Sequence, residues 1–343
     1  MADKHEWDKY DDEWLECPDE ESPFAEVPFY EEGYLKRLRV TPIVDINNPC
    51  NIYQFLKSHI YKQEQYCRDA AMILYNHVRG ITSRNFVCGP AGCGKTHLWE
   101  RLKEIYSNII IVDSSNITKD GWNGNNKVHN FLSQVDPFDP DYIIVFDEFD
   151  KLAAPKYSYN ENVSACIQSE LLKLVEGEII HSKRGQSDIS IDTSLMSFIF
   201  CGSFAQKAEE MAEKRCTTGI GFGAFQKNVK AFDEELTLQD IIDFGVIPEL
   251  ASRSTRITNL RPLTLDDYIS LLSKHPNSPV KRLEELYGIT INLSDAKCRE
   301  IAQKSYQSGL GVRNATAQIQ QIVDEQIFNN FEKNHSCTNI VVC

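Results

Sequence analysis

The 343-residue chain, with 42% hydrophobic and 25% charged residues, has the length and composition of a soluble protein with roughly two globular domains. Its formal net charge is −14, but residues 1–32 alone hold 13 Asp or Glu against 2 Lys or Arg, so the remainder is nearly neutral. Because the sequence has no basic patch, nucleic acid is disfavoured as the main partner. The 11 cysteines include no C-x-x-C pair, which disfavours a zinc site. The sequence has no long apolar run and no signal peptide, so we expect a cytoplasmic protein with no membrane partner.

The N-terminal segment, residues 1–35, alternates acidic residues with aromatic residues and prolines and shows no sustained period. Segments of this composition bury too little apolar surface to offset the entropy of ordering, so we expect a disordered acidic arm. Two interpretations stay open. The arm is either a solvated tail that aids solubility or a short motif whose aromatic residues dock on a partner or on the chain's own core.

Short apolar strands alternate with helical segments between residues 36 and 258. Two helical segments are expected between 41 and 80, the second of which covers 63–78, and the expected strands are 85–88, 109–113, 142–146 and 197–203. Continuous apolar strands separated by helices are typical of a parallel sheet that is covered on both faces. We therefore predict a large α/β domain over 36–258.

Beyond Leu260 we find no further strand pattern. Four helical segments are expected, at 263–273, 281–287, 294–307 and 312–331. This change in pattern predicts a second, small helical domain over 259–335, followed by a C-terminal tail at 336–343.

An apolar strand runs directly into a loop that fits G-x-x-x-x-G-K-[ST] at each fixed position. Glycines let backbone N–H groups wrap a triphosphate, Lys95 places a charge on the β- and γ-phosphates, and the Thr96 hydroxyl can bind Mg²⁺. We interpret Cys93 as a small filler and not as a redox switch. The sequence therefore predicts an ATP or GTP site formed by Gly89, Pro90, Ala91, Gly92, Cys93, Gly94, Lys95 and Thr96.

Two carboxylates, Asp147 and Glu148, follow the third apolar strand. A buried charge is costly without a metal or a partner, so acids at this place favour a functional role. P-loop enzymes keep there an acid that holds Mg²⁺ and a carboxylate that polarises the attacking water. We expect Asp147 in the first role and Glu148 in the second.

These motifs together resemble the ClpX family of AAA+ protein unfoldases. The likeness extends over roughly 41–331 and follows the family's order in segments 63–65, 75–78, 146–152, 167–177, 198–202, 219–224 and 243–250. It implies an AAA+ P-loop fold with a parallel sheet flanked by helices and a small helical domain. It also implies ATP and Mg²⁺ as cofactors.

The resemblance implies roles for two arginines. Arg253 falls where the family has an arginine finger that reaches the nucleotide of the neighbouring subunit, and Arg256 is a second candidate. For either arginine, a surface ion pair is the alternative. Gly311-Val312-Arg313 resembles the sensor-2 motif, in which Arg313 would link the nucleotide state to the angle between domains; an ordinary helix-surface arginine is the alternative.

Two loops are implied to contact other proteins. Ile220, Gly221 and Phe222 resemble the apolar plug that docks on the ClpP peptidase, with packing inside the chain's own domain as the alternative. Trp122 and Asn123 align with the pore loop that grips a substrate chain, where the family has Tyr and Val.

The chain also departs from the family. We expect no zinc-binding domain like that of the family, because the sequence contains no C-x-x-C pair. Lys62 stands where the family has a Gly before Gln63, and Ser203 stands where it has a Gly after sensor 1. These differences put substrate choice in question more than ATP hydrolysis.

The resulting prediction is an ATP-dependent, hexameric AAA+ unfoldase that delivers protein substrates to ClpP. A stand-alone remodelling chaperone without a peptidase is the first alternative. A nucleotide-switched scaffold or a nucleic-acid-associated AAA+ ATPase is the second, and neither of these needs a pore grip.

Overall fold

The computed structural model describes residues 44–118, 127–158, 161–184, 187–217, 231–273, 275–276, 278–309, 311–332 and 339–342. All of them belong to the unit Ile43–Cys343. The acidic arm predicted for residues 1–35 lies outside the described residues. Within the described part of the chain, no helix has the length and apolar character that a bilayer span requires.

Five parallel strands form the central sheet in the order β2-β3-β8-β1-β9. Their bounds are β1 Arg84–Cys88, β2 Ile109–Asp113, β3 Ile143–Asp147, β8 Ser197–Gly202 and β9 Arg256–Asn259. The predicted parallel sheet is therefore confirmed. The fifth strand was not expected, because β9 lies at an edge and buries only Thr258, so it lacks the continuous apolar run of its neighbours.

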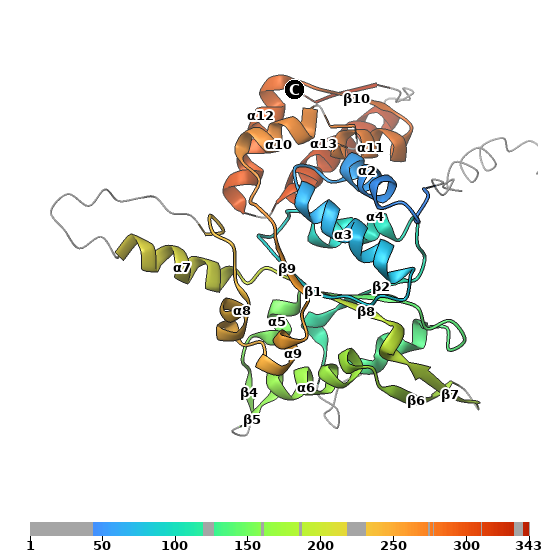
Figure 1. The fold of residues 1–343 in the computed structure, drawn as a ribbon. Helices are drawn as coiled ribbons and strands as arrows, with labels where there is room; N and C mark the ends of the chain where they lie inside the picture. Colours follow the sequence, from blue (N-terminus) through green and yellow to red (C-terminus); the bar gives the residue numbers. More distant parts are fainter. Residues whose placement is uncertain are drawn as a thin grey trace, which may run out of the picture. The chain divides into compact units, whose positions relative to one another are not determined.

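Helices cover both faces of this sheet (Figure 1). Side chains alternate along each strand, so that Val87 and Val145 join one hydrophobic cluster while Phe86, Phe146 and Phe200 join the other. The first cluster is covered by α2 Pro49–His59, α3 Glu64–His77 and α4 Lys95–Leu102. The second is covered by α5 Phe149–Ala153, α6 Val163–Glu176, α8 Leu238–Phe244 and α9 Pro248–Ser252.

Side-chain caps explain where several helices begin. Asn48 accepts a hydrogen bond from Cys50 N at the start of α2, and Asn162 accepts one from Ala165 N at the start of α6. Thr237 and Asp240 form a reciprocal capping box on α8. The remaining elements here are α7 Ala205–Thr217, three 3₁₀ turns and the strand pairs β4 Tyr157–Ser158 with β5 Glu161–Asn162 and β6 Ile179–Arg184 with β7 Ser187–Asp192.

The C-terminal part is helical, as predicted. Its helices are α10 Leu265–Ser273, α11 Pro279–Tyr287, α12 Asp295–Ser308 and α13 Val312–Glu332, which share a separate hydrophobic cluster. It also contains β10 Thr290–Leu293 and β11 Asn339–Val342, paired in parallel where the sequence analysis expected no strand and a tail. Four-residue strands are too short to show a clear period. The domain boundary at 258/259 stays a prediction.

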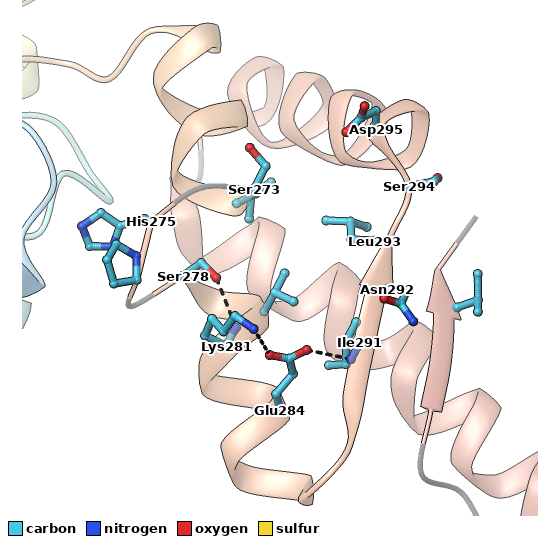
Figure 2. Close-up of a pocket in the computed structure, with 14 residues that line it drawn as sticks. Ser273, His275, Ser278, Lys281, Glu284, Ile291, Asn292, Leu293, Ser294 and Asp295 are labelled. Atoms are coloured by element: carbon cyan, nitrogen blue, oxygen red, sulfur yellow. Dashed lines mark hydrogen bonds and ion pairs between the residues drawn. The ribbon is translucent and has the colours of Figure 1, made fainter.

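A cavity of about 540 Å³ lies beside α11 and β10 (Figure 2). Its central polar groups are paired. The Glu284 carboxylate accepts a hydrogen bond from Ile291 N at 2.8 Å and pairs with Lys281 Nζ at 2.6 Å. Ser278 Oγ accepts from Lys281 N at 3.2 Å and caps α11. The pairing indicates that these side chains join α11 to β10.

Glu284 makes the stability of this region dependent on pH. Burial raises the pKa of Glu284, but the hydrogen bonds from Lys281 and Ile291 and the charge of Lys281 outweigh burial, so the pKa lies below its ordinary value. A carboxyl whose pKa is lowered on folding stabilises the protein above its unfolded pKa, and this contribution is lost as the pH falls through the folded pKa.

Glu284→Gln is therefore expected to lower the free energy of unfolding by about 1 kcal/mol at pH 7 and by almost nothing at about pH 3. Urea titrations of both proteins at the two pH values measure the difference. Glu285→Gln, which changes an exposed neighbour, is the matched control. An equal loss at both pH values would contradict the prediction.

Candidate nucleotide-binding site

The glycine-rich loop connects the end of β1 to the start of α4. Gly92 and Gly94 have φ angles of +73° and +94°, a backbone region that side chains other than Gly rarely enter. Gly94 caps the N-terminus of α4, whose first residue is Lys95. The loop therefore ends at a helix N-terminus, which is a favourable place for a phosphate group.

The structure brings the loop and the end of β3 into contact. Lys95 Nζ donates to the carbonyl oxygens of Gly89 and Pro90 at 2.7 and 2.9 Å. Thr96 Oγ1 donates to Asp147 Oδ2 at 2.6 Å. A hydroxyl beside a carboxylate is a pair of hard oxygen ligands, the donor type that Mg²⁺ prefers, so these residues fit a magnesium-bound nucleotide.

Glu148 lies next to this pair in a left-handed conformation with φ +52°. Such a conformation costs roughly 1–3 kcal/mol in a residue other than Gly and occurs often at functional sites. The backbone N–H of Glu148 donates to Asp147 Oδ1 at 3.0 Å, and its carboxylate pairs with Lys151 Nζ at 2.6 Å. The strained turn directs two adjacent carboxylates to the same end of the sheet.

A cavity of about 470 Å³ opens above these residues. It brings together most of the predicted site, namely Ala91, Gly92, Cys93, Gly94, Lys95, Thr96, Asp147, Glu148 and Arg313. Gly89 and Pro90 do not line it, although both give carbonyls to Lys95. A side chain on Gly89 would meet Leu260 Cβ at 2.7 Å, so Gly89 is required for packing.

Cys93 is buried and its thiol donates to Pro90 O at 2.9 Å. Burial raises the pKa of this thiol, so it stays protonated at neutral pH. These observations agree with the interpretation of Cys93 as a filler.

The sequence analysis missed one wall of the cavity. The lining residues that were not predicted come from the segment before α3 and from the C-terminal part, and include Ile60, Tyr61, Leu271 and Arg282. None of these four residues belongs to a motif, and only the tertiary fold places them opposite the glycine-rich loop. Leu271 and Arg282 lie in α10 and α11, where the sequence shows only ordinary helical periodicity.

Lys62 links the segment before α3 to the C-terminal part. It has φ +54°, a backbone region that favours Gly, and its Nζ pairs with Asp267 Oδ1 at 2.5 Å. Burial raises the pKa of Asp267, but hydrogen bonds from Lys62 and Thr264 outweigh it and lower the pKa. Gln63 Nε2 also donates to Arg261 O at 2.9 Å, so two consecutive residues hold the C-terminal part beside the cavity.

Arg253 does not line the cavity. Its guanidinium pairs with Glu176, and it lies close enough to Arg84 that burial and then the Arg253 charge lower the pKa of Arg84. Arg84 begins β1 and Cys88 ends it beside the loop, about 13 Å further along the strand. Within one chain, Arg253 is therefore at the end of the sheet away from the loop.

Arg256, the second candidate finger, pairs with the buried carboxylate of Asp69. Thr258 Oγ1 and Gln65 Nε2 donate to the same carboxylate at 2.8 and 3.0 Å. These contacts support the ion-pair alternative for Arg256.

Arg256→Ala is expected to lower the free energy of unfolding by about 2 kcal/mol, because it leaves a buried carboxylate without its charged partner. Arg253→Ala should lower it by less than about 0.5 kcal/mol, because its ion pair with Glu176 is half exposed. Denaturant titration measures both values. Equal losses would contradict the distinction between the two arginines.

The predicted protein-contact residues Trp122, Asn123, Ile220, Gly221 and Phe222 lie outside the described residues. Their roles stay predictions.

Comparisons with known proteins agree with this geometry. The ATPase family associated with various cellular activities (AAA) matches residues 86–223, and the C-terminal, D2-small domain of ClpB protein matches residues 263–339. The ATP-dependent Clp protease ATP-binding subunit ClpX of Porphyromonas gingivalis is 26% identical over 83% of this chain and 78% of its own length. The subunit of the same name from Treponema denticola is 25% identical over 87% of this chain and 81% of its own length. The chain is therefore an ATPase with a ClpX-like AAA+ core.

Proposed function

We propose that this chain is an ATP-dependent remodelling chaperone of ClpX type, which unfolds protein substrates as a hexameric ring and delivers them to a ClpP-type peptidase. The names of the related Clp protease subunits support this assignment. So does the cavity, in which a glycine-rich loop faces two carboxylates and an arginine from the C-terminal part.

The residues in the cavity divide the work of binding and hydrolysis. The loop from Gly89 to Lys95 would hold the phosphates of ATP, and Thr96 and Asp147 would hold Mg²⁺. Bound Mg²⁺ neutralises charge on the phosphates as a Lewis acid. Glu148 presents a carboxylate that can accept a proton from water, and its ion pair with Lys151 at 2.6 Å holds the side chain in place.

The position of Arg253 carries the ring proposal. One chain supplies the loop and the carboxylates at one end of β1, while Arg253 stands near the other end. A guanidinium can stabilise the transferring phosphate only if it reaches it, so a neighbouring subunit would have to supply this group. A site shared in this way favours a closed ring of identical subunits.

The unfolding of a stably folded fluorescent protein carrying unstructured tags tests the proposed function. With the full chain, Mg²⁺ and ATP, fluorescence should fall; with ADP, or with Lys95→Ala, it should not. ATP hydrolysis without any unfolding across the set of tags would favour the nucleotide-switched scaffold instead.

Delivery to a peptidase needs its own experiment. A pull-down with ClpP should retain the wild-type chain and lose Phe222→Ala. Phe138→Ala, which removes a phenylalanine that is 97% exposed, is the matched control. Unfolding activity without ClpP binding would indicate a stand-alone chaperone.

A further inference from the structure

The glycine-rich loop and the start of α13 meet through two glycine backbones. Gly92 and Gly311 both have positive φ angles, of +73° and +75°. A Cβ built on Gly311 would lie 2.5 Å from Gly92 Cα and 3.3 Å from Ala91 O, and a Cβ built on Gly92 would meet Gly311 Cα first. Real Cβ atoms essentially never approach other atoms below 3.0 Å, so neither position accepts a side chain in this arrangement.

Gly311 also sets where α13 begins. The helix starts at Val312, and Asn314 N donates to Gly311 O at 3.2 Å. Val312, Arg313 and Thr316 line the cavity beside the loop. The position of Gly311 on the loop therefore decides how far Arg313 reaches into the cavity.

The rest of α13 belongs to the C-terminal part. Ala315, Ile319 and Val323 are completely buried in the hydrophobic cluster of that part. A well-packed helix moves as a unit with its cluster, so the contact at Gly311 links the glycine-rich loop to the whole C-terminal part.

We infer that Gly311 is a positioning residue, whose missing side chain lets α13 rest on the backbone of the glycine-rich loop and so brings Arg313 to the nucleotide. The inference rests on the proposed function, in which this loop holds phosphates. It adds that the loop and α13 change position together. A bound nucleotide that fixes the conformation of the loop then also fixes the position of the first turn of α13.

The chain contains a matched control for the test. Gly309 has φ +67°, and a Cβ built on it meets nothing within 4 Å. Alanine at 309 therefore introduces the same unfavourable backbone conformation as alanine at 311, two residues away, without the steric conflict. The difference between the two variants isolates the contact with Gly92.

The experiment measures binding of a fluorescent ADP analogue to the full chain, with thermal unfolding in the absence of nucleotide recorded in parallel. Gly309→Ala should bind like the wild type, and Gly311→Ala about tenfold more weakly, a difference worth about 1.4 kcal/mol. Both variants should unfold at similar temperatures without nucleotide, because α13 can move away from the loop. Arg313→Ala should weaken binding in the wild-type chain but change it little in Gly311→Ala, because coupled residues are not additive.

Equal affinities of Gly309→Ala and Gly311→Ala would overturn the inference. If Gly311→Ala does not fold, hydrogen exchange of the wild-type chain decides: nucleotide should slow amide exchange over 311–316 and leave the turn at Gly288 unchanged. No slowing over 311–316 would equally overturn it. Failure of the wild-type chain to bind or hydrolyse ATP would refute the proposed function itself, which keeps the two failures distinct.

Discussion

Replacement of Glu148 by glutamine is expected to leave nucleotide affinity within about threefold of the wild type and to lower ATP turnover at least about a hundredfold. Glutamine has nearly the same shape but cannot accept a proton from water. Binding should persist because the loop, Lys95 and Thr96 are untouched. Affinity is measured with a fluorescent nucleotide, and turnover by release of inorganic phosphate.

The neighbouring strand supplies a matched control for this experiment. Asp113 ends β2 in register with Asp147, but it lies outside the cavity. Its carboxylate accepts hydrogen bonds from Ser115 and Asn116, and the bond from the Ser115 hydroxyl is the main reason that its pKa is lowered. Asp113→Asn should therefore retain turnover. Undiminished hydrolysis by Glu148→Gln would refute the role of Glu148.

Arg253→Ala is expected to lower ATP turnover by about a thousandfold, a loss at the lower end of those known for arginine fingers. The reason is geometric, because the guanidinium is remote from the loop of its own chain and would act on a neighbouring subunit. Loss of the half-exposed ion pair with Glu176 should hardly affect folding. Arg299→Ala, which removes an exposed arginine of α12, should be neutral.

Mixed rings test whether Arg253 acts between subunits. Arg253→Ala and Glu148→Gln chains should each be inactive alone, and a mixture should recover part of the turnover. In the mixture, an intact cavity of an Arg253→Ala chain meets an intact Arg253 of its neighbour. A chain with both substitutions should rescue neither. Failure of the two single variants to rescue each other would place Arg253 outside a shared site.

The sequence predicted the parts of the fold that carry continuous patterns. The strands β2, β3 and β8 are apolar over most of their length, and β1 is apolar from Phe86 to Cys88, because both faces of the sheet are covered. The edge strand β9 and the short pair β10 and β11 were not predicted, because at least half of the side chains in each strand are not buried in a core. In these strands, burial depends on neighbours that are distant in the sequence.

The candidate site likewise has one side that the sequence predicted and one that it did not. Lys95, Thr96, Asp147 and Glu148 belong to motifs, and the structure brings them together at one cavity. The opposite wall includes Tyr61, from the segment before α3, and Arg282, from the C-terminal part, and neither residue belongs to a local motif. Motifs therefore locate the phosphate end of a nucleotide site better than its remaining walls.

The ion pair between Lys62 and Asp267 gives the cavity a property that glycine could not supply. Lys62 is 57% exposed at its side chain, so dissolved ions screen its attraction to Asp267. The hydrogen bonds between Gln63 and Arg261 carry no net charge and are much less sensitive. Closure of the cavity should therefore loosen as ionic strength rises, and nucleotide affinity should fall with it, whereas a Lys62→Gly chain should respond less.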